Sequence, residues 1–183
     1  MCDVFMNKDR VVLQSGLQSL SVMKTTQSGW ANFLRDNYTT LPETTERILA
    51  TTLDVKWTYT RTKLSELLRL DFDGIHRQIR DAALGQFFGP PKTGIYSKGV
   101  QETLFKMASA AIETVKEIDT VTFSLPNLHF LPCSLPVYQQ NGILFEDDVF
   151  IPSDEPHGLI TATVSRWKTA RPPSTSSLRR SRL

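Results

Sequence analysis

The sequence has few of the residues that build metal sites or disulfide frameworks. Its 183 residues include two cysteines, Cys2 and Cys133, and three histidines without a paired spacing. Two cysteines cannot make a disulfide framework or a zinc site by themselves, and scattered histidines argue against a dedicated metal centre. We therefore expect no metal in this protein.

Long apolar runs are also missing. No stretch approaches the roughly 18 apolar residues that indicate a membrane-spanning helix, and residues 1–10 lack the apolar core of a signal peptide. From these absences we expect no membrane partner.

Acidic residues are absent from the end of the chain. Six of the 21 basic residues lie from Arg166 onward, where there is no acidic residue. The rest of the chain therefore carries 15 basic and 19 acidic residues, a net charge of −4 against +2 overall. A mildly acidic body disfavours nucleic acid as a partner. With 40% apolar and 22% charged residues, that body has the composition of one globular domain.

Alternation of apolar and polar residues predicts the strands. It is clear over residues 47–59 and 118–130, and weaker over 17–25 and 159–167. Residues 11–13 are strand-like but have no obvious partner nearby.

Two amphipathic helices are predicted between the strong strands. The first begins at Asp71 or Asp73, either of which can cap it, and Gly89 with the two prolines after it ends the helix. The second follows Ser97 as its N-cap and keeps one apolar face as far as Val115. The order strand, strand, helix, helix, strand, strand predicts an α+β fold, an antiparallel sheet with both helices on one face.

The last residues of the chain resemble a targeting signal. From residue 168 the composition is that of a flexible basic tail, and it ends in Ser181, Arg182 and Leu183. A small residue, a basic residue and a final leucine form a conservative variant of the Ser-Lys-Leu peroxisomal address, although chance can produce the same ending. We expect peroxisomal location, with the import receptor as a partner.

Asn127 and His129 end a strong strand just after a proline. Residues two apart on an extended chain point to the same side, so both side chains can face one pocket. An amide offers a donor and an acceptor, and a histidine can move a proton near neutral pH. The alternative is a structural histidine at the edge of a sheet.

Other residues could bind a flat ligand, although each also has an ordinary structural explanation. The guanidinium of Arg47 can grip a planar group through two parallel hydrogen bonds. Val100 and Gln101 lie in the first turn of the second helix, where backbone N–H groups are free and an amide can pair with a purine edge. The indole of Trp30 can stack on a ring, or be part of the core.

Four separated blocks of sequence resemble the urate oxidase family. They cover nearly all the chain from about Val11, occur in the family's order, and are residues 27–30 and 33–44 with Arg47, residues 96–107, residues 124–130 and residues 181–183. The resemblance implies the tunnelling fold, built of ββααββ units and assembled as a homotetramer. It also implies a peroxisomal enzyme of purine catabolism that uses no metal or organic cofactor. Such an enzyme converts urate, O2 and water into 5-hydroxyisourate and hydrogen peroxide.

The resemblance also implies a role for each candidate residue. Trp30 stands where family members carry an aromatic residue, usually phenylalanine, that stacks on urate. Arg47 and Gln101 clamp the flat edge of urate, and the backbone of Val100 adds a contact. Asn127 lies over the ring where O2 or water sits, and His129 belongs to a proton relay.

The match corresponds to the second half of the family's chain. We expect residues 1–15 to be a remnant of a first tunnelling-fold domain, residues 16–167 to be the second domain, and residues 168–183 to be the tail. In the family, the relay also needs a lysine and a threonine of the first domain, so we expect this chain alone to have little activity. The alternative function is a catalytically incomplete purine-binding or assembly module.

Overall fold

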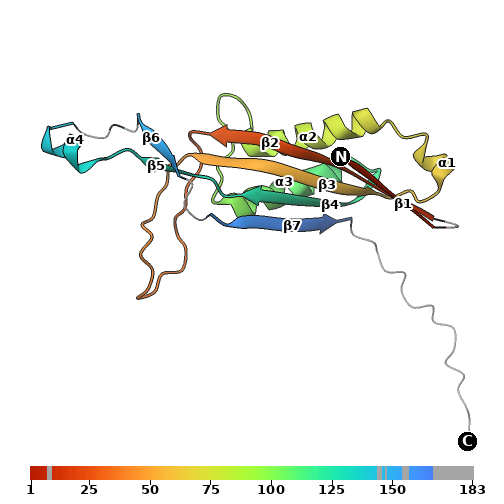
Figure 1. The fold of residues 1–183 in the computed structure, drawn as a ribbon, viewed down its shortest axis with the longest axis horizontal. Coiled ribbons are helices and arrows are strands. Elements are labelled where there is room, and N and C mark those ends of the chain that lie inside the picture. The colour runs from red at the N-terminus through yellow and green to blue at the C-terminus, as the bar shows by residue number, and fades with distance from the viewer. Residues whose placement is uncertain (8–9, 144–145, 147, 154–156, 167–183) are drawn as a thin grey trace, which may run out of the picture.

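A five-stranded antiparallel sheet forms the body of the protein (Figure 1). The computed structural model describes residues 1–166 except 8–9, 144–145, 147 and 154–156. The strands of the sheet, in spatial order, are β1 (Cys2–Asn7), β2 (Arg10–Lys24), β3 (Leu49–Tyr59), β4 (Ile118–Pro126) and β7 (Leu159–Ser165).

Two long helices, α2 (Phe72–Phe88) and α3 (Val100–Thr114), cover one face of this sheet (Figure 1). The short helices are α1 (Leu64–Leu67) and α4 (Pro136–Gln140). A separate two-stranded sheet contains β5 (His129–Pro132) and β6 (Phe150–Ser153). Within the described part of the chain, no helix is long and apolar enough to cross a membrane.

The predicted alternation along β3 places its apolar residues between the sheet and the helices. Leu53, Val55 and Trp57 are buried, while Asp54 and Lys56, which point the other way, are exposed. The buried faces of α2 and α3 pack on this layer, so the main core lies between the helices and the sheet. The predicted fold class, with both helices on one face, is confirmed.

The opposite face of the sheet carries hydroxyl groups that pair across neighbouring strands. The pairs lie at 2.6 to 3.2 Å and are Thr58–Thr120, Thr122–Thr163, Ser124–Thr161 and Ser21–Thr52. Because these side chains satisfy one another and face outward, this side of the sheet is polar, as the alternation predicted.

The helix boundaries confirm one predicted cap and correct another. Asp71 caps α2 by accepting a hydrogen bond of 2.9 Å from the backbone N–H of Gly74, and Gly89 ends the helix at a φ of 71°. The prediction that Ser97 caps the second helix was wrong. Gly99 is the N-cap residue, and the chain at Ser97 has not yet turned, so the Ser97 hydroxyl accepts a hydrogen bond from Lys24 instead.

The strands also differ from the prediction in two places. The strand-like residues 11–13 do have partners, because β2 is continuous from Arg10 and pairs with β1 on one side and β3 on the other. A register shift between Leu17 and Leu20 explains why alternation there is imperfect. The boundary expected at residue 15 falls inside this continuous strand.

The long strand predicted over residues 118–130 is divided. β4 ends at Pro126, which has no N–H to donate, and the chain then turns, with the Asn127 N–H bonding to the carbonyl of Gly158 at 2.9 Å. His129 begins β5 in the second sheet. Asn127 and His129 therefore lie where one sheet passes into the other.

Arg166 ties together the end of α3 and the start of β4. Its guanidinium donates to the carbonyl oxygens of Ile112 and Val115 at 2.6 and 2.8 Å, and to that of Ile118 at 3.2 Å. Carbonyls at the end of a helix have no partner within the helix, and a cation there also interacts favourably with the helix dipole.

We predict that Arg166→Met lowers the free energy of unfolding by about 2–3 kcal/mol, because three carbonyl groups lose a charged donor while the apolar stem is kept. Chemical denaturation measures this loss. Arg77→Met, at an exposed position of α2, is the matched control and should change stability by less than about 0.5 kcal/mol. Equal stability of the two variants would contradict the role given to Arg166.

Candidate functional site

A pocket of about 290 Å³ lies beside the point where β4 passes into β5. Its lining includes all the predicted site residues except Val100 and is formed by Trp30, Leu41, Pro42, Thr44, Arg47, Gln101, Asn127 and His129. These residues come from the long connection between β2 and β3, from the start of α3 and from the β4–β5 connection, so only the fold brings them together.

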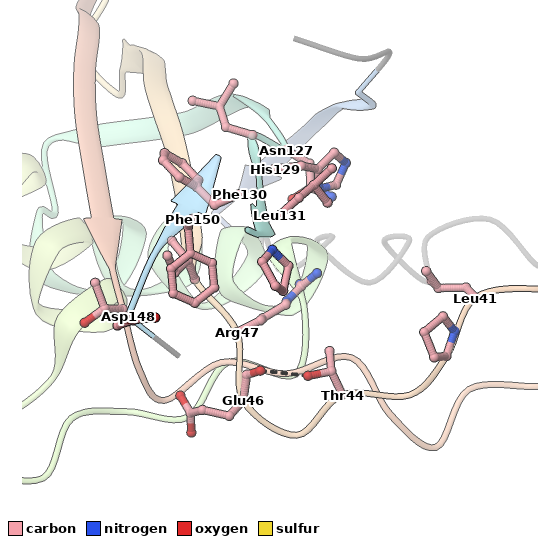
Figure 2. A pocket seen from close by; sticks show the side chains of 15 residues that line it. Leu41, Thr44, Glu46, Arg47, Asn127, His129, Phe130, Leu131, Asp148 and Phe150 are labelled. Carbon is pink, nitrogen blue, oxygen red and sulfur yellow. Dashed lines mark hydrogen bonds between the residues drawn. The ribbon is translucent and has the colours of Figure 1, made fainter. Parts of the chain in front are cut away.

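A wider groove of about 650 Å³ adjoins this pocket and shares Arg47, Asn127 and His129 with it. Figure 2 shows the Arg47 side chain directed toward the side where Asn127 and His129 lie. Glu46 points away from them, and its backbone carbonyl accepts a hydrogen bond of 2.7 Å from the Thr44 hydroxyl. The pocket is therefore one end of a longer open groove.

The segment that carries Trp30 is bonded on one side to the chain before α3. The N–H of Gly29 donates to the carbonyl of Ser97 at 3.0 Å, and the N–H of Ser97 donates to the carbonyl of Gln27 at 2.9 Å. These two bonds place residues 27–30 alongside residues 95–97, as a short parallel bridge between Ser28 and Ser97.

The other side of the same segment is bonded to the chain before β3. Trp30 and Thr44 exchange both of their backbone hydrogen bonds, at 2.7 and 2.9 Å, and the N–H of Arg47 donates to the carbonyl of Ser28 at 2.8 Å. Backbone bonds therefore hold both Trp30 and Arg47, and none of these bonds uses the Arg47 guanidinium.

Gly29 allows these segments to lie so close together. The Tyr96 hydroxyl crosses over it and donates to the carbonyl of Thr45 at 2.9 Å. A Cβ atom at Gly29 would collide with that hydroxyl and lie 2.8 Å from the carbonyl oxygen of Thr44. Any larger residue at this position would displace the Tyr96 side chain from Thr44 and Thr45.

The indole of Trp30 lies against the first turn of α3. A Cβ atom at Gly99 would be 2.8 Å from Cζ3 of Trp30 and 3.2 Å from Oε1 of Gln101. On its own loop, Trp30 stacks with Phe33 at 5.7 Å between ring centroids and 24° between planes. Val100 is 3% exposed and is not among the residues that line the pocket.

Arg47 is the charged residue of the pocket. Its guanidinium carbon lies 6.0 Å from the centroid of the Trp30 ring, and its Nε atom is buried without a hydrogen-bond partner among the described residues. Burial lowers the pKa of Arg47, and the neighbouring Tyr96 opposes this shift. A buried donor without an acceptor is costly, so this nitrogen is suited to a ligand oxygen or nitrogen.

Asn127 and His129 both line the pocket, as their spacing predicted. Leu128 between them points elsewhere, and its N–H donates to the carbonyl of Ala50 at 3.2 Å. This bond joins the β4–β5 connection to the start of β3, just after Arg47. Arg47, Asn127 and His129 therefore lie on two neighbouring segments that this hydrogen bond joins.

Sequence reasoning missed part of the site. Leu41, Pro42 and Thr44 line the pocket but were not predicted as site residues. Lys24, which bonds Ser97, was also missed, and its one signal is a lysine at an inward position of an alternating strand.

The predicted address, Ser181 to Leu183, lies outside the described residues. Among those residues, no group of His, Cys, Asp or Glu is gathered that could hold a metal ion.

Comparisons with known proteins agree with this geometry. The model of the family described as Uricase matches residues 13–161. The chain is 46% identical to Uricase-2 isozyme 1 of Glycine max over 156 residues, which are 84% of this chain and 50% of that protein. It is 42% identical to the uricase of Arabidopsis thaliana, covering 84% of this chain and 51% of that one.

A solved structure extends the likeness to three dimensions. The crystal structure of uricase from Arthrobacter globiformis superposes with a TM-score of 0.74 and 34% identity, over 91% of this chain and 58% of that one. The predicted tunnelling fold is thereby confirmed. The chain spans about half the length of the plant uricases it matches. With a family model over most of its residues and relatives above 40% identity, the chain belongs to the uricase, or urate oxidase, family.

Proposed function

We propose that this chain supplies the urate-binding part of a urate oxidase site, and that the assembled enzyme converts urate, O2 and water into 5-hydroxyisourate and hydrogen peroxide. The observation that carries the proposal is Arg47, whose buried Nε has no partner in the described part of the chain, at a pocket that also gathers Trp30, Gln101, Asn127 and His129. Membership of the uricase family gives the substrate class.

The pocket suits a flat, polar ring. The fork of the Arg47 guanidinium and the amide of Gln101 can hydrogen-bond the edge of a purine, while the indole of Trp30 offers a face for stacking. The free N–H of Val100 adds a fixed donor at the start of α3. A site that pairs each edge group rejects analogues that lack them, because its own donors would then stay buried without acceptors.

The reaction transfers two electrons from urate to O2, and water supplies the hydroxyl of 5-hydroxyisourate. Urate must lose a proton to become rich enough in electrons, and the charge of Arg47 favours the anion. In this proposal Asn127 holds O2 or water over the ring, and His129 passes protons as one member of the relay. The remaining members, by family resemblance, are a lysine and a threonine of a first domain.

We propose the family's organisation for the assembled protein. Residues 16–167 form the second tunnelling-fold domain, residues 1–15 belong with a first domain, and the assembly is a homotetramer. The final Ser181, Arg182 and Leu183, carried on the tail of residues 168–183, address it to the peroxisome through the import receptor. No metal or organic cofactor is part of this proposal.

A second candidate function is a purine-binding or assembly module without turnover of its own. It is favoured by the pocket itself, where Arg47 and Gln101 suit the edge of a purine ring without any proton transfer. Both candidates require Arg47 to bind the ligand, and only the first requires His129 to move protons.

Arg47→Met should weaken binding of xanthine, or of urate without oxygen, by at least about ten-fold, because each buried ligand oxygen loses a charged partner that is worth about 1.5–3 kcal/mol. Isothermal calorimetry on the 183-residue chain measures the affinity. Arg80→Met is the control, since Arg80 is partly exposed on α2 and pairs only with Asp81 among the described residues. Unchanged affinity of the Arg47 variant would contradict the ligand-binding role given to Arg47.

The chain alone should show little or no urate oxidation, because the missing relay members would cost about 10²–10⁴ in rate. Loss of urate absorbance together with oxygen consumption measures turnover. Adding the first domain of a uricase should restore activity, and His129→Ala should abolish the restored part. Full turnover by the isolated chain would contradict the relay argument and favour a proton donor within these 183 residues.

Removing Ser181 to Leu183 should leave urate binding intact and shift the protein from peroxisomes to cytosol, because the receptor reads a free C-terminus. Fluorescence imaging with an N-terminal tag measures the distribution, in cells that lack any other uricase. Peroxisomal location that survives the deletion would rule out this address.

A further inference from the structure

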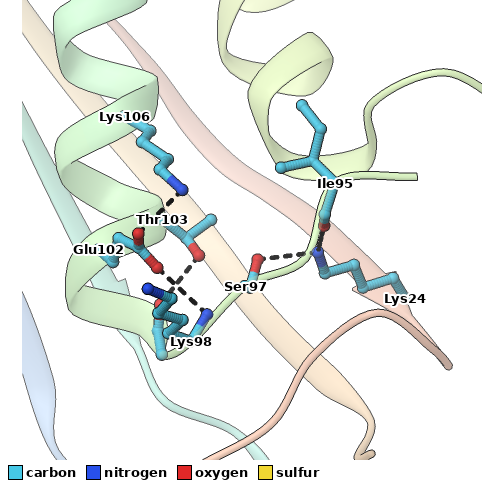
Figure 3. A network of polar contacts seen from close by, with 8 residues as sticks. Lys24, Ile95, Ser97, Lys98, Glu102, Thr103 and Lys106 are labelled. Carbon is cyan, nitrogen blue, oxygen red and sulfur yellow. Dashed lines mark hydrogen bonds and ion pairs between the residues drawn. The ribbon is translucent and has the colours of Figure 1, made fainter. Parts of the chain in front are cut away.

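Lys24 is a buried lysine outside the pocket. It ends β2, is 8% exposed, and its ammonium donates to the carbonyl of Ile95 at 2.7 Å and to the hydroxyl of Ser97 at 2.8 Å (Figure 3). The ammonium also lies 5.5 Å from the centroid of the Phe87 ring on α2. Among the described residues, neither of the two ion pairs involves Lys24.

Keeping a cation at this position is costly. Burial is the main cause that lowers the pKa of Lys24 to about 8, the carboxylate of Glu46 raises it, and the ammonium of Lys106 on α3 lowers it further. An apolar residue of similar length would fill the same space without that cost. We therefore expect Lys24 to matter for the position of Ile95 and Ser97, which its ammonium bonds, rather than for stability.

The ammonium holds the chain that separates two walls of the pocket. Ser97 receives the bond from Lys24 on its side chain, and its backbone is bonded to Gln27 and Gly29 at 2.9 and 3.0 Å. Trp30 follows Gly29 directly, so one wall is one residue away from these bonds. Two residues after Ser97, the other wall begins at Gly99, against which the Trp30 indole packs.

We propose that Lys24 is a positioning residue, whose ammonium fixes Ser97 and thereby sets the separation between Trp30 and the start of α3 that carries Gln101. For the ligand, this inference rests on the proposed function. For the geometry of the turn, it rests on the contacts alone. Lys24 touches no ligand in this proposal, and acts only through Ser97.

A second lysine, on α3, provides a matched control. Lys106 pairs with Glu102 at 2.9 Å, and the Glu102 carboxylate also accepts from the backbone N–H of Lys98 at 3.2 Å (Figure 3). This network stabilises the first turns of α3 from its exposed side and does not contact Ser97. Removing the charge of Lys106 changes the field near Lys24 but leaves its two hydrogen bonds in place.

The first experiment needs no ligand. Hydrogen exchange of the backbone amides of Gly29 and Ser97, measured by NMR, reports the bridge between the two segments. In Lys24→Met and in Ser97→Ala these two amides should exchange at least about ten-fold faster, while Trp30, bonded to Thr44, and the amides of β3 and β4 should not change. Lys106→Met should match the unmodified chain.

The same variants should weaken binding of urate, measured by calorimetry without oxygen, by at least about ten-fold, because supporting residues typically contribute that much to a site.

The contribution of Lys24 should also depend on pH, and the stability of the fold and the affinity for urate should change in opposite directions. Lys24 has a lower pKa folded than unfolded, so between about pH 8 and 10 the unfolded chain binds more protons. Relative to Lys24→Met, the unmodified chain should therefore gain stability over this range.

Urate affinity should fall over the same range, again relative to Lys24→Met, because a neutral amine bonds Ser97 more weakly than an ammonium does. If Lys24 had only a structural role, stability would rise over this pH range without a fall in urate affinity. Normal exchange at Gly29 and Ser97 in Lys24→Met, or an equal acceleration across the whole sheet, would overturn the inference. Failure of the unmodified chain to bind urate, with the local exchange effect intact, would reject the ligand and support the positioning of the turn.

Discussion

The candidate site depends on the backbone of residues 28–30, which is hydrogen-bonded on both sides. One side is bonded to Ser97, before α3, and the other to Thr44 and Arg47, before β3. Loops as long as these ordinarily move, and a clamp on a planar ring tolerates little movement. Because the pairing uses backbone groups, Trp30, Arg47 and Gln101 are positioned without using the side-chain atoms that a ligand needs.

The sheet makes this arrangement rigid enough to be useful. Its helical face is a continuous apolar core, and α3 is anchored at its far end by Arg166. The start of α3 therefore cannot shift without disturbing buried contacts of Leu104 and Met107. On the opposite face, threonine hydroxyls of neighbouring strands bond one another, so they need no partner in the core.

Periodicity predicted what depends on burial, and missed what depends on local bonding. The strand over β3 and the two helices were predictable because one face of each packs in the core. The end of β4 at Pro126 was not, because alternation continues across the turn that moves His129 into a second sheet. The cap at Ser97 failed for a similar reason. A serine before a helix favours capping, but here the Ser97 hydroxyl accepts a hydrogen bond from the buried Lys24. Arg47 and Gln101 were found through family resemblance, since each is ordinary by itself.

The geometry separates binding from chemistry. The buried Nε of Arg47 has no acceptor among the described residues, so a ligand atom could supply one. His129, like Arg47 and Asn127, lines both the pocket and the wider groove. In the proposed site, a proton taken up by His129 can pass along the groove to whatever covers it, whereas the proposed ring-binding residues all belong to this chain. A binding site made by one domain and a relay completed by another would make turnover depend on assembly, while recognition of the purine edge would not.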